Sequence, residues 1–126
     1  MNIDDDSTLI IIVGENEQEC RGLINLIEEE KYKGITVKTI SALKAYLSEK
    51  KCMVVLIDID TVPVENRELR ELTIKYSQNS FLCMSNDKYH PELKEAICYH
   101  IYACINKPVN PDELFFLLRS IRDDGQ

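Results

Sequence analysis

Short apolar runs alternate with longer, more polar stretches along this chain. Five runs are rich in Ile, Val and Leu, and they lie at residues 9–13, 35–40, 53–57, 81–84 and 101–105. They lack the strict alternation that marks a half-exposed strand, so they are typical of strands covered on both faces. The second run is more polar, with Thr36 and Lys38 between apolar positions, which predicts a strand at the edge of the sheet.

The stretches between these runs carry helix signals. The first predicted helix follows Asn16, with Glu19 three residues on, which predicts a capping box: Asn16 accepts a backbone hydrogen bond and Glu19 reaches back. Further helices are predicted over residues 42–49 and 66–77, and from Pro91 onward. The last helix has Asn110 as its N-cap and Pro111 at its first position, followed by apolar residues at helical spacing.

Strand and helix therefore alternate five times. Right-handed crossovers between such units give a parallel sheet with helices on both faces. We predict an α/β fold with a doubly wound, five-stranded parallel sheet. The length of 126 residues suits a single domain over residues 1–126, with its core over about residues 8–123.

The charge balance narrows the set of partners. Asp and Glu number 22 against 15 Lys and Arg, which gives a formal net charge of −7. This charge repels phosphate backbones and anionic lipid heads, so we expect no direct binding of nucleic acid or membranes. The apolar runs are far shorter than the roughly 20 residues of a membrane span.

The cysteines and the N-terminus indicate the compartment. Five cysteines, an odd number without a Cys-x-x-Cys pair, argue against a disulfide framework or a zinc site. Most of them lie in apolar stretches, where a free thiol packs as a small hydrophobic group. The acidic N-terminus is unlike a secretory signal. We therefore expect core cysteines and a cytoplasmic protein.

Polar residues follow the apolar runs, where the strands are expected to end. In sheets of this kind the ligand site lies outside the carboxyl ends of the strands. These residues are Gly14, Glu15 and Asn16, then Asp58 and Asp60, then Ser85 and Asn86, and finally Asn106 and Lys107. Clustered carboxylates at an open edge suit Mg²⁺, and a carboxylate held there can attack a phosphoryl donor. Lys107 and Ser85 offer the ammonium and the hydroxyl that stabilise the resulting dianion.

In these features the chain resembles the receiver domains of two-component response regulators, the CheY-like family. The family's fifth strand ends in a Lys-Pro pair, as at Lys107-Pro108, and a capped last helix follows. Its phosphoacceptor Asp ends the third strand, as Asp58 does, and its fourth strand ends in Thr or Ser, as at Ser85. The resemblance extends over residues 9–122.

The resemblance implies a flavodoxin-like sheet with strand order 2-1-3-4-5. It implies that Asp58 accepts a phosphoryl group from a histidine kinase or a phosphotransfer protein. It further implies that Lys107 pairs with the phosphate, that Ser85 moves towards it, and that the peptide bond before Pro108 is cis. The signal then leaves through the face formed by the fourth helix, the fifth strand and the fifth helix.

A Mg²⁺ site is implied as well, with Glu15, Asp58 and Asp60 as candidate ligands and Asn16 as a weaker one. Here the chain departs from the family, whose first strand is followed by an acidic pair. Either Gly14-Glu15 or Glu15-Asn16 stands at that place, so Glu15 is the single certain acid. Asn16 serves equally well as a helix cap, which weakens the predicted metal site.

Two further departures concern the acceptor and the switch. Pro63 comes five residues after Asp58, where the family has a proline at four, so Asp60 is an alternative acceptor. We prefer Asp58 because it directly ends the apolar run. Cys104 replaces the family's switch aromatic, and Tyr102, on the same side of the strand, is either its substitute or a packing residue.

These departures leave two functions open. The first is a phosphorylatable receiver, a signalling domain rather than an enzyme, with a histidine kinase or phosphotransfer protein upstream and a downstream protein or its own output domain. The second is a degenerate receiver that works as an interaction module without phosphorylation. Phe116 is expected to face outward from the last helix, where an exposed aromatic suits a homodimer or another partner.

Overall fold

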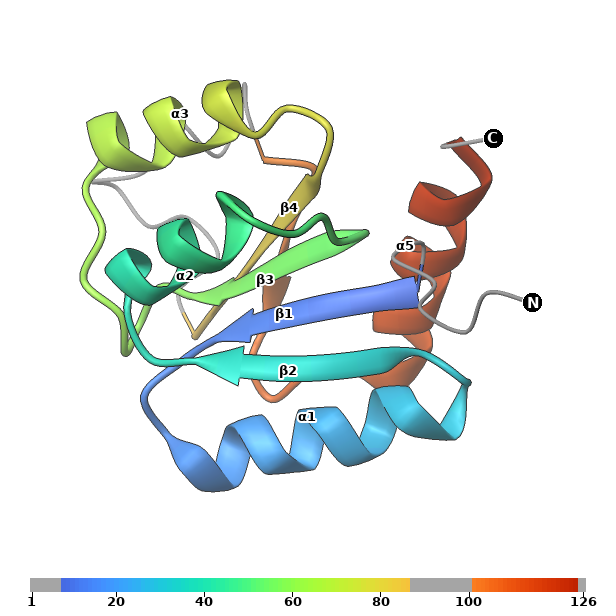
Figure 1. The fold of residues 1–126 in the computed structure, drawn as a ribbon. Helices are drawn as coiled ribbons and strands as arrows, with labels where there is room; N and C mark the ends of the chain where they lie inside the picture. The colour runs from blue at the N-terminus through green and yellow to red at the C-terminus, as the bar shows by residue number, and fades with distance from the viewer. Residues whose placement is uncertain (1–7, 87–100, 125–126) are drawn as a thin grey trace.

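A five-stranded parallel sheet forms the centre of the molecule (Figure 1). The computed structural model describes residues 8–86 and 101–124. The strands are β1 Leu9–Val13, β2 Lys33–Val37, β3 Val54–Asp58, β4 Ser80–Ser85 and β5 Ala103–Asn106. They lie in the order β2-β1-β3-β4-β5, which confirms the doubly wound fold and the edge position of the second strand.

Helices cover both faces of this sheet. In the two described ranges they are α1 Glu17–Glu29, α2 Ile40–Leu47, α3 Asn66–Lys75 and α5 Pro111–Asp124. The helices α1 and α5 pack on one face, and α2 and α3 pack on the other (Figure 1). The helix predicted from Pro91 lies outside the described residues.

The strands β1, β3 and β4 send alternate side chains into two separate cores, because successive residues of a strand point to opposite faces. In β1, Ile10 and Ile12 join the core under α1 and α5, whereas Ile11 and Val13 join the core under α2 and α3. All four side chains are buried. Both faces are covered, which explains why the run is continuously apolar.

Several predicted boundaries are wrong by up to three residues; the helices predicted over residues 42–49 and 66–77, for example, are observed over 40–47 and 66–75. The second run was expected over residues 35–40, but β2 ends at Val37 because Thr39 caps the next helix. The Thr39 hydroxyl accepts a hydrogen bond from the backbone N–H of Ala42 at 3.0 Å, so α2 begins at Ile40. The last strand also begins later than expected, at Ala103.

The helix caps agree with the sequence in part. Asn16 accepts a hydrogen bond from the backbone N–H of Glu19 at 3.0 Å, as predicted. The other half of the capping box is wrong, since the Glu19 carboxylate lies 3.1 Å from the Lys107 ammonium instead of reaching back. At the start of α5, Asn110 accepts from the backbone N–H of Asp112 at 2.9 Å, which confirms the last cap.

The cysteines pack as core residues where they are described. Cys20, Cys52 and Cys83 are buried and Cys104 is half-buried, and all four are free thiols. Burial raises the pKa of the Cys20 and Cys83 thiols, so both stay protonated and inert. Cys98 lies outside the described residues. No helix in the described ranges is long and apolar enough to cross a bilayer.

Gly34 marks a close approach between β2 and α1. A Cβ atom at this position would collide with Cδ1 of Ile24 and would lie 2.7 Å from Cδ1 of Ile27. At Gly22, inside α1, a Cβ atom would meet nothing within 4 Å outside its own helix backbone and chain neighbours. An alanine at either position restricts the unfolded chain to a similar extent. A difference in stability between the two alanine variants therefore reports the local packing and not the entropy of the unfolded chain.

We expect Gly34→Ala to lower the free energy of unfolding by about 1–3 kcal/mol, since two isoleucine methyl groups must move. Gly22→Ala should raise it by about 0.5–1 kcal/mol, because alanine favours the helix. Urea unfolding followed by circular dichroism measures both changes. Similar effects of the two substitutions would contradict the close approach of β2 to α1.

Candidate functional site

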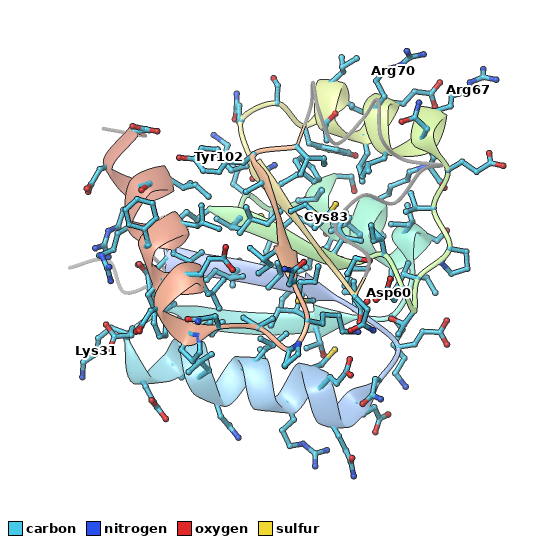
Figure 2. All side chains as sticks on the ribbon, turned by 180° about the vertical axis from the view of Figure 1, so that it is seen from behind. Lys31, Asp60, Arg67, Arg70, Cys83 and Tyr102 are labelled. Atoms are coloured by element: carbon cyan, nitrogen blue, oxygen red, sulfur yellow. The ribbon has the colours of Figure 1, made fainter. Side chains whose placement is uncertain are left out.

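The carboxyl ends of β3, β4 and β5 bring the predicted polar residues to one edge of the sheet. Asp58 is the last residue of β3, Ser85 is the last of β4, and Lys107 directly follows β5. Parallel pairing places Asp58 beside Met84, one residue before Ser85. Figure 2 shows Asp60 at this same edge, in the segment that leaves β3.

Asp58 is a buried carboxylate with a cationic partner. Its side chain is 4% exposed, and its Oδ2 lies 2.9 Å from Nζ of Lys107. The same ammonium lies 3.1 Å from Oε1 of Glu19, in the first turn of α1. Lys107 thereby connects β3 to α1, and its own side chain is 12% exposed. A charged carboxylate stays in such a buried place only with a partner of this kind.

The environment of Lys107 keeps it charged. Burial by itself lowers the pKa of the ammonium, but the hydrogen bonds to Asp58 and Glu19 and the attraction of their charges outweigh burial, and the pKa is raised. Lys107 is therefore a permanent positive charge at physiological pH. The prediction that it lies at the Asp58 carboxylate agrees with this geometry.

Asp60 makes a second set of contacts at the same edge. Its backbone N–H donates to Oδ1 of Asp58 at 3.1 Å. Its own carboxylate accepts from the hydroxyl of Ser85 at 2.7 Å and from the backbone N–H of Asn86 at 2.7 Å. Ser85 therefore donates to Asp60 and not to Asp58.

The first loop holds the remaining candidates, Glu15 and Asn16. The backbone N–H of Glu15 donates to the hydroxyl of Thr61 at 3.2 Å, and its side chain is exposed. The side-chain oxygen of Asn16 is engaged as the cap of α1. Of the two readings of Asn16, the helix cap is therefore the observed one.

The predicted metal ligands are not arranged to bind a metal ion in this structure. The Asp58 carboxylate binds Lys107 and the Asp60 amide, and the Asp60 carboxylate binds the end of β4. Within residues 8–86 and 101–124, no group of three potential Asp, Glu, His or Cys ligands comes together. The cation that neutralises Asp58 here is the Lys107 ammonium, and Mg²⁺ binding stays a prediction from the sequence.

A hollow of about 420 Å³ opens beside the Asp58–Lys107 pair. Leu23 and Leu26 of α1 form one part of its wall, and Val109 of the segment that leads into α5 forms another. The peptide bond between Lys107 and Pro108 is cis, as the resemblance implied. The paired charges thus line a hollow that opens to solvent and that also has apolar side chains in its wall.

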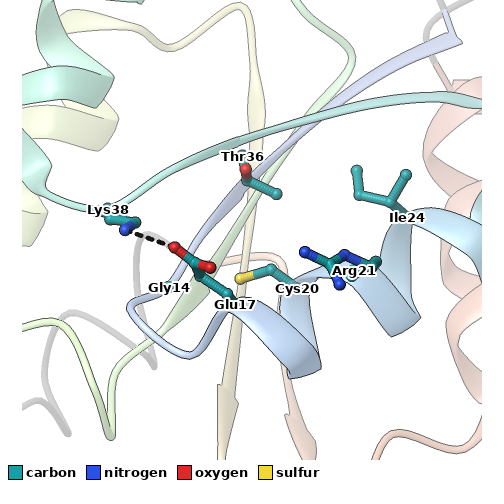
Figure 3. Close-up of a pocket in the computed structure, with 7 residues that line it drawn as sticks. All are labelled: Gly14, Glu17, Cys20, Arg21, Ile24, Thr36 and Lys38. Atoms are coloured by element: carbon teal, nitrogen blue, oxygen red, sulfur yellow. Dashed lines mark hydrogen bonds and ion pairs between the residues drawn. The ribbon is translucent and has the colours of Figure 1, made fainter.

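A second hollow, of about 290 Å³, lies between α1 and β2 (Figure 3). An exposed ion pair between Lys38 and Glu17, with 2.9 Å between the charged atoms, lies across it. Arg21 and the buried Cys20 also line this hollow, whereas Asp58 and Lys107 do not. Of these two hollows, the Asp58–Lys107 pair therefore lines the first and not the second.

Two aromatic side chains are exposed: Phe116 of α5, as predicted, and Tyr102, which directly precedes β5. Phe116 is 63% exposed, and Tyr102 is 43% exposed with its hydroxyl 3.5 Å from Oδ2 of Asp124. Cys104, at the place of the family's switch aromatic, is half-buried. The fourth helix, the third part of the expected output face, lies outside the described residues.

Sequence reasoning missed one member of the site. Glu19 was interpreted as part of a capping box, yet its carboxylate binds Lys107. Its place in the first turn of α1, close to the carboxyl end of β1, was the available signal. The capping pattern of Asn16 gave a simpler explanation for the same acid, and a distant lysine partner leaves no trace in local spacing.

Solved structures share this fold over almost the whole chain. The receiver domain of an HD domain-containing protein from Pseudomonas fluorescens Pf-5 has 18% identity and a TM-score of 0.81, covering 93% of this chain and 95% of that one. A CheY-like receiver domain protein from Methanospirillum hungatei JF-1 has 18% identity and a TM-score of 0.82, covering 94% and 95%.

A third similar structure shows the fold within a longer protein. NtrX from Brucella abortus has 16% identity and a TM-score of 0.78, covering 93% of this chain and 28% of that one. No protein-family model and no curated protein matches the sequence. The two receiver-domain structures establish that this chain has the fold of receiver domains.

We expect Lys107→Met to lower the free energy of unfolding by about 2–3 kcal/mol, because Asp58 then stays buried without its cation. The matched substitution Lys38→Met removes an exposed ion pair and should leave stability nearly unchanged. Urea unfolding at neutral pH measures both. Equal losses in the two variants would contradict a buried role for the Asp58–Lys107 contact.

The same contact has a pH signature. The pKa of Lys107 is raised in the folded chain, so its contribution is present in full below the ordinary lysine value of 10.5. It is lost as the pH rises through the raised folded value. The stability difference between wild type and Lys107→Met should therefore stay constant from neutral pH to that point and then shrink. A difference that grows with alkaline pH would contradict this sign.

Proposed function

We propose that this chain is a phosphorylatable receiver of two-component signalling, in which Asp58 accepts the phosphoryl group. The observation that carries the proposal is the buried Asp58 carboxylate at the end of β3, held 2.9 Å from the Lys107 ammonium. The fold shared with receiver domains supports it. The donor is a phosphohistidine of a histidine kinase or of a phosphotransfer protein.

The transfer is a displacement at phosphorus. A carboxylate oxygen of Asp58 forms the new O–P bond, the P–N bond of the phosphohistidine breaks, and its electron pair leaves with the imidazole, which takes up a proton from solvent. The product is an acyl phosphate with close to two negative charges. Lys107, already at Asp58, stabilises that charge without first having to be recruited.

Asp58 suits this role better than Asp60. Lys107 contacts Asp58, and both oxygens of Asp60 accept hydrogen bonds from the end of β4. Asp58 is also fixed from both sides, by Lys107 on Oδ2 and by the Asp60 amide on Oδ1. A carboxylate held in one orientation presents its oxygens to a donor in a defined direction.

A receiver must also pass its signal on through a surface that another protein recognises. We propose that phosphorylation changes the surface made by the fourth helix, β5 and α5, and that a downstream protein, an output domain or a second copy reads it. Exposed Phe116 and Tyr102 add apolar and aromatic area to this surface. The free, buried thiols of the described residues suit a reducing cytoplasm.

Incubation with a small acyl phosphate and Mg²⁺ should add one phosphoryl group, measured by intact mass. Asp58→Asn should abolish the gain because the amide is not a nucleophile, whereas Asp60→Asn should keep it. Circular dichroism of both variants controls for folding. A gain that survives in Asp58→Asn and disappears in Asp60→Asn would move the acceptor to Asp60. No gain in any form would favour an interaction module that works without phosphorylation.

A further inference from the structure

The carboxylate of Asp60 engages two hydrogen-bond donors at the end of β4, the Ser85 hydroxyl and the Asn86 amide. We propose that Asp60 is an internal anion that holds the Ser85 hydroxyl and the Asn86 amide in the unphosphorylated chain, and that it must leave them before they can bind a phosphoryl group on Asp58. This inference rests on the proposed function and concerns the regulation of the same site.

The backbone puts both anions in one place. Asp58 pairs with Met84 across the two strands, so the next residues of β4 lie at the edge beyond it. The segment after β3 bends over that edge, with the N–H of Ile59 donating to the carbonyl of Met84 at 3.2 Å. The N–H of Asp60 donates to Oδ1 of Asp58. A group attached to Asp58 therefore meets the Asp60 carboxylate at the end of β4.

The contacts of Asp60 are of the kind that a phosphoryl group makes. One oxygen accepts from a hydroxyl and the other from a backbone amide, both at 2.7 Å. Donor–acceptor distances this short are typical of hydrogen bonds to a charged acceptor. Two oxygens of a phosphoryl group would use the same two donors. A hydroxyl has a single proton to donate, so Ser85 cannot serve both anions at once.

Charge adds to this competition. A phosphoryl group brings roughly 1.5–2 negative charges, which repel the single charge of Asp60 in the same small space. Residue Asp60 is exposed, so its side chain can rotate outward into water, where its charge is solvated. Displacement is therefore feasible, but it loses two charge-assisted hydrogen bonds each time. The internal anion lowers the affinity of the site for a phosphoryl group.

Beryllofluoride, which binds an aspartate carboxylate in place of a phosphoryl group, tests this without group transfer. We expect Asp60→Asn and Asp60→Ala to bind it at least about tenfold more tightly than wild type, because two charge-assisted hydrogen bonds no longer compete. Asp123→Asn, in the last turn of α5, removes the same charge elsewhere and should behave as wild type. The backbone amide signal of Asn86, followed by NMR in the presence of Mg²⁺, reports binding.

Salt separates competition for donors from plain repulsion. At about 0.5 M salt, repulsion between exposed charges is largely screened, but occupied hydrogen-bond donors stay occupied. The advantage of the Asp60 variants should persist there. Equal affinities for wild type and both Asp60 variants, or an advantage that disappears in high salt, would overturn the inference.

Two readouts keep this inference distinct from the proposed function. Without any ligand, Asp60→Asn should shift the Asn86 amide proton, since its charged acceptor is gone; an unchanged signal would overturn the inference alone. If wild type takes up a phosphoryl group on Asp58 and the Asp60 variants hold it no better, the inference alone is overturned. If neither wild type nor any variant binds beryllofluoride or takes up a phosphoryl group, the proposed function fails and the inference fails with it.

Discussion

A carboxylate buried at the end of a strand needs a compensating charge, and the arrangement of the site follows from how Asp58 obtains one. Lys107, which directly follows β5, contacts this carboxylate, with 2.9 Å between the charged atoms. The lysine can do so because β5 ends next to β4, and β4 ends next to β3. A single ion pair thus depends on the register of three strands, and the same register brings Ser85 and Asp60 to the site.

Much of the fold was predictable because burial on both faces leaves a strong mark on a sequence. The continuous apolar run at β1 has side chains in both cores, so it could not alternate. The boundaries were less predictable, since a single hydroxyl, that of Thr39, decides where β2 gives way to α2. Such a local competition between a strand and a cap has no periodic signal.

The candidate site was also predictable only in part. Asp58, Ser85 and Lys107 were predicted because each follows an apolar run, and the structure brings them to one edge. The hydrogen bonds of Asp60 to Ser85 and Asn86 were not predicted, because they depend on how the segment after β3 bends over β4. For the same reason the contact of Glu19 with Lys107 was not predictable from the sequence. Strand ends are visible in a sequence, whereas contacts between the segments that follow them are not.

Two departures from the receiver pattern, after β1 and after β3, involve residues that make contacts within the chain. Where an acidic pair would follow β1, the chain has Glu15 and Asn16, and Asn16 is engaged as a helix cap. The cationic partner of Asp58 is the Lys107 ammonium, which Asp58 shares with Glu19.

At the other side of Asp58, the extra acid Asp60 supplies an anion for the donors of β4. The charges and donors at this edge are therefore paired with one another within the chain. If Asp58 accepts a phosphoryl group as proposed, that group would replace such a pairing instead of filling an open place, and its binding would depend on the contacts that the chain already makes.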